Sequence, residues 1–243
     1  MPQYLRLVTT FLIGYTFFFV GCDDMEQMME PVLTDPEISV ELEGMLIDFP
    51  DPNLRDAVQE TLDLASADAI TPEILQTLTQ LDAWNRGITD LTGLEQATQL
   101  KVINLHNNAI RDITPLSKLT QLTELSLSLN EISNIRPISG LAQLTTLVLY
   151  GNQIRDVMPL EGLMQLTTLG LRDNQITDIR PIAGLVQLTA LDLDGNNIND
   201  IRPIAALVNL KFLFLQENPI TDKAPLQTLL EKNPDVQINI NAN

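Results

Sequence analysis

The chain contains little of what metal sites, disulfide frameworks and hydrolytic active sites are built from. Among 243 residues there is one cysteine, Cys22, and one histidine, His106, so neither an internal disulfide nor a cysteine and histidine ligand set can form. The sequence also has no G-x-S-x-G, no H-E-x-x-H and no glycine-rich phosphate loop near the histidine. These absences predict a protein that is not an enzyme and that holds no metal or cofactor.

Basic residues are also scarce. The 14 lysines and arginines face 32 aspartates and glutamates, which gives a formal net charge of −18. Because nucleic acid is itself a polyanion, this charge argues against nucleic acid as a partner. An acidic balance favours a cationic partner, and it also keeps an exported protein soluble.

The apolar run near the start is too short for a membrane-spanning helix. Residues 7–20 follow Arg6 and cover 14 positions, whereas crossing a bilayer takes roughly 20 residues. A positive start followed by a short apolar run is typical of a secretion signal, here residues 1–21. Gly21-Cys22 resembles the bacterial lipobox, in which the cysteine becomes lipidated, although Phe19 stands where leucine is usual. The alternative is an ordinary cleaved signal that leaves Cys22 as a free thiol.

The segment after the signal is strongly acidic. Between Asp23 and Asp51 there are ten acidic residues and no basic one, interleaved with prolines. Such a composition favours a solvated tether, residues 22–47, that begins at the lipidated Cys22. A leader without function explains the same composition.

A strict 22-residue step runs through the rest of the chain and indicates a repeat architecture. It is visible in six asparagines and six prolines: Asn108, Asn130, Asn152, Asn174, Asn196 and Asn218, with Pro115, Pro137, Pro159, Pro181, Pro203 and Pro225. Written in rows of 22, residues 78–231 give seven rows, and the aliphatic residues fall into shared columns. One row cannot bury its own aliphatic side chains, so the rows must stack. The pattern Leu-x-x-Leu-x-Leu predicts one strand per row in a parallel sheet, and the proline-containing return segment predicts short 3₁₀ or extended turns.

The rows resemble the leucine-rich repeats of the bacterial internalin-like class. Residues 166–182, with the sequence LTTLGLRDNQITDIRPI, carry the motif in full. The resemblance implies an α/β repeat solenoid, a right-handed superhelix with the parallel sheet on its concave face and short convex turns. Two rows depart from the pattern, row one with Arg86 in the asparagine column and row seven with Lys223 in an aliphatic column.

Both ends of the stack need a cap. Asp51-Pro52 reads as the start of a helix, and Thr71-Pro72 as the start of a second short one that runs into Leu78, so residues 48–77 are expected to form a helical N-terminal cap. At the other end, residues 232–243 read as a turn and a closing strand in which Val236, Ile238 and Ile240 alternate inward.

The outward strand positions, columns three, five, seven and eight of each row, are called the strand face below. The repeat imposes no side chain there, yet four of the five aromatic residues that follow the signal and the only histidine lie on it. The candidate binding residues are Trp84, His106, Tyr150, Arg172, Asp173, Asp192, Asp194, Phe212 and Phe214. Two alternatives stay open: Trp84 packs against the N-terminal cap, and the two phenylalanines pack under the C-terminal cap.

One further acidic column could be mistaken for a metal site. Aspartate or asparagine recurs in the 22-residue step at Asp90, Asp112, Asn134, Asp156, Asp178, Asp200 and Asp222. Because the column follows the repeat and precedes each return segment, we expect these side chains to cap turns.

Exposed aromatic residues with polar neighbours favour a binding function. The hypothesis is a monomeric, non-catalytic module of the bacterial cell envelope, anchored to a membrane through lipid alone, that recognises a protein or peptide partner through the concave face. The surplus of acids on that face favours a cationic partner, and a glycan is a further class. The alternative is a structural or scaffolding envelope lipoprotein without a dedicated ligand.

Replacing Cys22 with serine tests the lipid anchor. The serine cannot carry the lipid, so the variant should leave the membrane pellet and appear in the soluble fraction when broken cells are fractionated and blotted. Retention of the variant in the membrane pellet would contradict the anchor and indicate that residues 7–20 remain as an uncleaved helix.

Overall fold

The computed structural model describes residues 46–66 and 68–240. The expected signal peptide, Cys22, nearly all of the tether and residues 241–243 lie outside the described residues. Within the described part, no helix combines the length and the hydropathy that a bilayer crossing requires.

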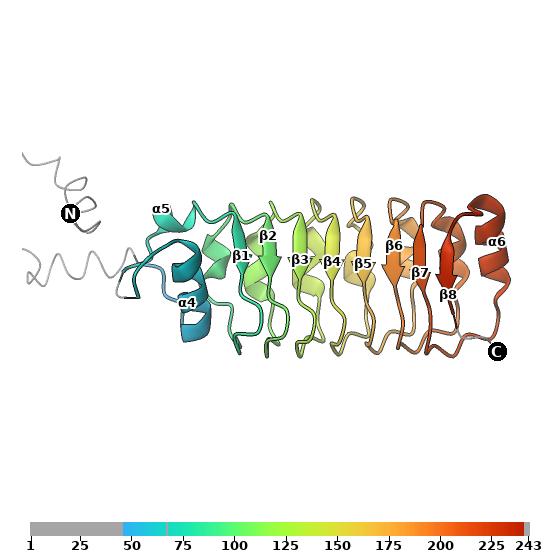
Figure 1. Cartoon of the computed structure of the whole chain (residues 1–243), viewed down its shortest axis with the longest axis horizontal. Coiled ribbons are helices and arrows are strands. Elements are labelled where there is room, and N and C mark those ends of the chain that lie inside the picture. Colours follow the sequence, from blue (N-terminus) through green and yellow to red (C-terminus); the bar gives the residue numbers. More distant parts are fainter. Residues whose placement is uncertain (1–45, 67, 241–243) are drawn as a thin grey trace, which may run out of the picture. The chain divides into compact units, whose positions relative to one another are not determined.

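Eight short strands form one parallel sheet in chain order, as Figure 1 shows. The strands are β1 Gln80–Asp82, β2 Val102–Asn104, β3 Glu124–Ser126, β4 Thr146–Val148, β5 Thr168–Gly170, β6 Ala190–Asp192, β7 Phe212–Phe214 and β8 Gln237–Asn239. From β1 to β7 each residue pairs with the residue 22 positions later, for example Leu125 with Leu147. The 22-residue step in the sequence is therefore the register of the sheet.

The aliphatic columns form one continuous core between the sheet and the return segments. Leu125 and Leu127, both from the strand segment of row three, are at most 1% exposed, and Ile132 and Ile135 from the same row are equally buried. Each row meets the same residue types in the rows beside it, so aliphatic side chains are buried along the whole stack. This arrangement confirms the predicted leucine-rich-repeat solenoid.

The repeated asparagine fastens each row to the row before it. Asn152 donates from Nδ2 to the carbonyl oxygens of Leu127 and Leu149, each at 3.0 Å, and its Oδ1 accepts from the backbone N–H of Ile132 at 3.0 Å. All six asparagines make this set of bonds, and from Asn130 to Asn196 they are buried. The amide satisfies backbone groups that the chain leaves unpaired where it turns off the sheet.

Short 3₁₀ helices form the return segments of rows one to six. They are η2 Leu94–Gln96, η3 Thr114–Lys118, η4 Arg136–Gly140, η5 Met158–Leu160, η6 Arg180–Gly184 and η7 Arg202–Ala206. The aspartate and asparagine column precedes them, and each side-chain oxygen accepts the backbone N–H two residues later, as Asp112 does from Thr114 at 2.8 Å. These residues therefore cap turns, as their period predicts.

Two helices cover the first row, α4 Pro52–Thr61 and α5 Pro72–Leu75 (Figure 1). Asp51 is the N-cap of α4, and its second carboxylate oxygen accepts from the backbone N–H groups of Thr89 and Asp90 in row one. Arg86, the residue that breaks the asparagine column, forms a bidentate pair with Glu60 of α4. Row one is preceded by a helix instead of another row. The side chain of Arg86 therefore pairs with that helix, whereas the asparagines of the later rows bond to strand carbonyls.

The last return segment differs from the prediction of a short 3₁₀ or extended turn. Row seven forms an α-helix, α6 Ala224–Lys232, with Pro225 in the first turn, where a missing N–H costs nothing. The register from β7 to β8 is 25 residues, as Phe212 pairs with Gln237, so this segment is three residues longer than in the other rows. No eighth 22-residue row follows, so the last return segment does not have to match the length of a neighbouring one. The longer segment can form an α-helix.

Removing one buried asparagine should destabilise the stack. Asn152→Ala leaves the N–H of Ile132 without its side-chain acceptor and removes one of the two asparagine donors from each of the carbonyls of Leu127 and Leu149. We therefore expect a loss of about 1–3 kcal/mol in the free energy of unfolding. Urea titration followed by circular dichroism measures this. The matched control is Gln165→Ala, an exposed amide in the same row, which should change little. Equal stability of the two variants would contradict the role of the asparagine.

Candidate functional site

The strand face ends in a column of left-handed backbone. The residue before the asparagine column has a φ between 52° and 65° in all seven rows. These residues are Asn85, Asn107, Leu129, Gly151, Asp173, Gly195 and Glu217. Glycine, asparagine and aspartate adopt this conformation at low cost, whereas a leucine does not.

His106 and Tyr150 meet across the row between them. The Tyr150 hydroxyl lies 3.3 Å from Nδ1 of His106, and the ring centroids are 5.7 Å apart with a tilt of 53°. The intervening row carries Ser128 in the same column. Its side chain is fully buried, and its Oγ has no hydrogen-bond partner. Two residues that are 44 positions apart in sequence thus form one polar and aromatic unit over a small side chain.

Leu129 was not among the sequence-predicted candidates, although it belongs to the strand face. It is 43% exposed beside the His106 and Tyr150 pair, in the left-handed column. A Cβ added to Gly151 would lie 2.5 Å from Cδ2 of Leu129, so the leucine side chain covers the glycine of the next row. The signal that could have found it is an aliphatic residue in a column that holds only Asn, Gly, Asp and Glu in the other rows.

The remaining aromatic candidates lie at the two ends of the face. Trp84 is 54% exposed, so the N-terminal cap does not enclose it. Phe212 is 43% exposed, while Phe214 is partly buried between Asp192 and Asn239, its partners in the neighbouring strands. Phe212 is therefore not enclosed by the C-terminal cap, whereas Phe214 is partly buried.

Rows five and six hold the acidic part of the predicted site. Arg172 donates from Nε to Asp173 at 3.1 Å, and both side chains are about half exposed. Asp192 is partly buried, and its Oδ1 accepts the backbone N–H of Asp194 at 3.1 Å. Asp194 is only 7% exposed, and its Oδ1 accepts the backbone N–H of Gln216 at 2.6 Å. From the sequence, Asp194 is predicted to point outward and contact a partner. In the structure its side chain is buried and bonds the backbone of the neighbouring row instead.

Burial raises the pKa of the Asp192 carboxyl, and repulsion from Asp194 adds to the rise, although Arg172 and a backbone N–H oppose it. Burial likewise raises the pKa of Asp194, with Glu217 and Asp173 contributing and the hydrogen bond from Gln216 opposing. Two neighbouring carboxylates are therefore held in surroundings that disfavour their charge. A cationic group placed next to them would relieve part of this cost.

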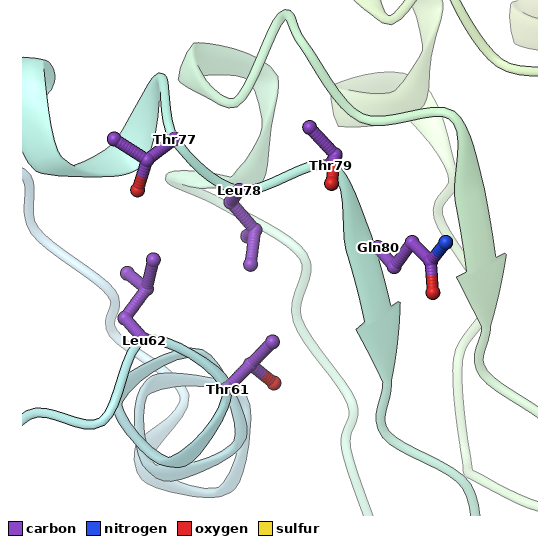
Figure 2. A pocket seen from close by; sticks show the side chains of 6 residues that line it. All are labelled: Thr61, Leu62, Thr77, Leu78, Thr79 and Gln80. Atoms are coloured by element: carbon purple, nitrogen blue, oxygen red, sulfur yellow. The ribbon is translucent and has the colours of Figure 1, made fainter.

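The described residues hold a hollow beside the N-terminal cap and no metal-binding cluster. Among them, no group of three or more histidine, aspartate or glutamate side chains could hold a metal ion. An open hollow of about 330 Å³ lies beside the N-terminal cap, between the end of α4 and the start of β1 (Figure 2). It is lined by Thr61, Leu62, Thr77, Leu78, Thr79 and Gln80, none of which titrates near neutral pH.

Fold and site together define a repeat solenoid whose outward strand residues are free to contact a partner. Sequence models of the family described as leucine-rich repeats (2 copies) match residues 76–118, 120–162 and 165–206. The chain belongs to the leucine-rich repeat family, in its internalin-like class.

Solved structures carry the same likeness. Internalin C2 from Listeria monocytogenes is 34% identical, with a TM-score of 0.64, over 79% of this chain and 94% of that one. The internalin InlF from the same organism is 29% identical, with a TM-score of 0.67, over 80% of this chain and 64% of that one. The ectodomain of the Arabidopsis thaliana receptor kinase GASSHO1/SCHENGEN3, solved in complex with CASPARIAN STRIP INTEGRITY FACTOR 2, is 25% identical, with a TM-score of 0.56, over 64% of this chain and 20% of that one. No curated protein matches the chain.

The raised pKa of Asp192 predicts a stability that depends on pH. An acid whose pKa is higher in the folded state stabilises the fold below its unfolded value, 3.8, and loses that contribution as pH rises through the folded value. Asp192→Asn keeps the Oδ1 acceptor and removes the charge. The variant should melt at a higher temperature than the wild type at pH 7, and the difference should disappear below about pH 3.8. Thermal melts between pH 3 and 7 measure it, and a constant difference at all pH values would contradict the assignment.

Proposed function

We propose that this protein is a non-catalytic binding module that recognises a protein or peptide through its strand face. The observation that carries the proposal is the exposure of aromatic and aliphatic side chains on a face where the repeat requires none. Trp84, Leu129 and Phe212 are each at least 43% exposed. Hot spots of protein interfaces are enriched in aromatic side chains, and a rigid sheet presents them without loss of backbone entropy.

The charge of the face adds a preference for a cationic partner. The strand face carries Glu124, Asp173, Asp192 and Glu217 as exposed or partly buried acids, and the pairing of Arg172 with Asp173 offsets only one of them. Lysine or arginine on the partner would be complementary, and it would speed association at low ionic strength.

We further propose that the module is exported and held at a bacterial membrane through a lipid on Cys22, with residues 22–47 as the tether. The support is the sequence around Gly21-Cys22 and the acidic composition that follows it. A tether of about 25 residues would let the strand face meet a partner away from the membrane surface.

One of the comparisons supports a binding role. The plant receptor ectodomain was solved in complex with a factor that it binds, and it shares the repeat architecture with this chain. The listerial internalins share that architecture over about four fifths of this chain. Since a repeat scaffold can carry unrelated specificities, the identity of the partner has to come from the strand face of this chain.

Affinity capture from envelope extract tests the binding role against the alternative of a scaffold without a dedicated ligand. The full chain, purified in detergent, should retain a defined protein, and Tyr150→Ala combined with Phe212→Ala should lower the affinity of the purified pair by at least about tenfold. The melting temperature should hardly move, because neither side chain belongs to the core.

The matched control is Val186→Ser, which alters an exposed apolar residue outside the strand face and should leave the affinity unchanged. Equal capture by the double variant and the wild type would exclude the strand face as the site. Capture of no specific protein by either chain would favour the scaffold.

A further inference from the structure

Leu129 is the residue of the strand face that is hardest to explain by folding. Its φ of 52° lies in the left-handed region, where leucine is disfavoured, and the other rows place Asn, Gly, Asp or Glu there. The side chain is not part of the core, since it remains 43% exposed. Backbone conformations that oppose the residue type concentrate at sites of function.

The neighbours of Leu129 make it a rigid apolar projection. On one side its side chain covers Gly151, where any larger residue would collide with it. Its backbone N–H donates to the carbonyl oxygen of Tyr150 at 2.8 Å. Tyr150 and His106 join over the preceding residue, Ser128, whose buried Oγ has no partner. An aliphatic surface is thus placed beside a tyrosine and histidine pair, at a spot held on both sides by neighbouring rows.

The acids lie at a fixed distance from this spot. Asp192 is in row six, two rows from Tyr150 and three from Leu129, and it stands two and three columns earlier in the repeat than these residues. Steps of about 4.8 Å across the sheet and about 3.3 Å along it place them roughly 12–17 Å apart. In the row between them, Gly170 pairs with Asp192 and has no side chain of its own, while Arg172 of the same row stands in the column of Tyr150 and is paired with Asp173. An extended peptide covers the same distance in about four or five residues.

We propose that Leu129, with Tyr150 and His106, is the anchor for an apolar side chain of a basic peptide segment whose lysine or arginine reaches Asp192. This rests on the proposed function and gives the partner its chemistry: an aliphatic or aromatic residue separated by about four or five positions from a base. Burial of the Asp192 carboxylate and its repulsion from Asp194 supply the charge complementarity for the base.

A phage-displayed library of random twelve-residue peptides, panned against the full chain in detergent, is the probe. Enriched peptides should share the apolar and basic pair at this spacing. For a synthetic peptide of the consensus, Leu129→Asn should lower the affinity by at least about tenfold, as expected for an interface hot spot. Asp192→Asn should lower it less and weaken its dependence on salt, while Val186→Ser should leave it unchanged.

The stability of Leu129→Asn separates recognition from packing. Asparagine is favoured in the left-handed conformation and already occupies this column at Asn85 and Asn107. The melting temperature of the variant should therefore equal or exceed that of the wild type while peptide binding is lost. A lower melting temperature would show that Leu129 is kept for its packing over Gly151 and would overturn the inference.

The remaining outcomes distinguish the two proposals. Peptides that bind Leu129→Asn as tightly as the wild type, yet lose affinity for Tyr150→Ala with Phe212→Ala, would overturn the anchor and leave the strand face as the binding site. Peptides insensitive to all of these substitutions would overturn both. Failure to enrich any peptide over an unrelated control protein would also overturn the anchor.

Discussion

The stack depends on the side-chain amide of the repeated asparagine. Where the chain turns off the sheet, backbone N–H and C=O groups lack backbone partners, and this amide bonds them across neighbouring rows. In Asn174 the Nδ2 group bonds the carbonyl oxygens of Leu149 and Leu171, and the Oδ1 bonds the N–H of Ile154. Two of these three bonds go to the preceding row. The aliphatic core supplies the bulk of the stabilisation. The amide fixes the register between neighbouring strands, and this register sets the positions of the outward side chains.

Where the preceding row is missing, the same need is met by other means. Row one replaces its asparagine with Arg86, which pairs with Glu60 of the first helix, and Asp51 joins that helix to the turn of row one. At the other end the chain adds a helix and a strand to the last row. Each end device substitutes for an absent neighbour, as expected of a structure in which every repeat contacts only the adjacent ones.

Much of the fold could be predicted from the sequence because its periods repeat: the strands and the turn-capping acids follow from column positions. The start of the first helix follows from the local pair Asp51-Pro52. The prediction failed where a residue departs from its column for a local reason. The helix of row seven depends on the longer spacing to the last strand, and the burial of Asp194 depends on its bond to the Gln216 N–H of the next row. The sequence leaves open whether Trp84 packs on the N-terminal cap, and it does not predict the contact of His106 with Tyr150, which joins two rows across a third. Such distances between rows are not encoded in any single row.

A fixed register also limits how this surface can evolve. Positions on the strand face are separated by whole multiples of one strand spacing, because the amide bonds admit only complete rows. Duplication or loss of a 22-codon unit between Tyr150 and Asp192 would move the aromatic part of the face and its acids apart or together by about 4.8 Å, without altering either. Changes of any other length would place an asparagine opposite the wrong carbonyls. Evolution can therefore change the distance between contact residues only in whole strand spacings. Point substitutions change the side chain at each of these positions.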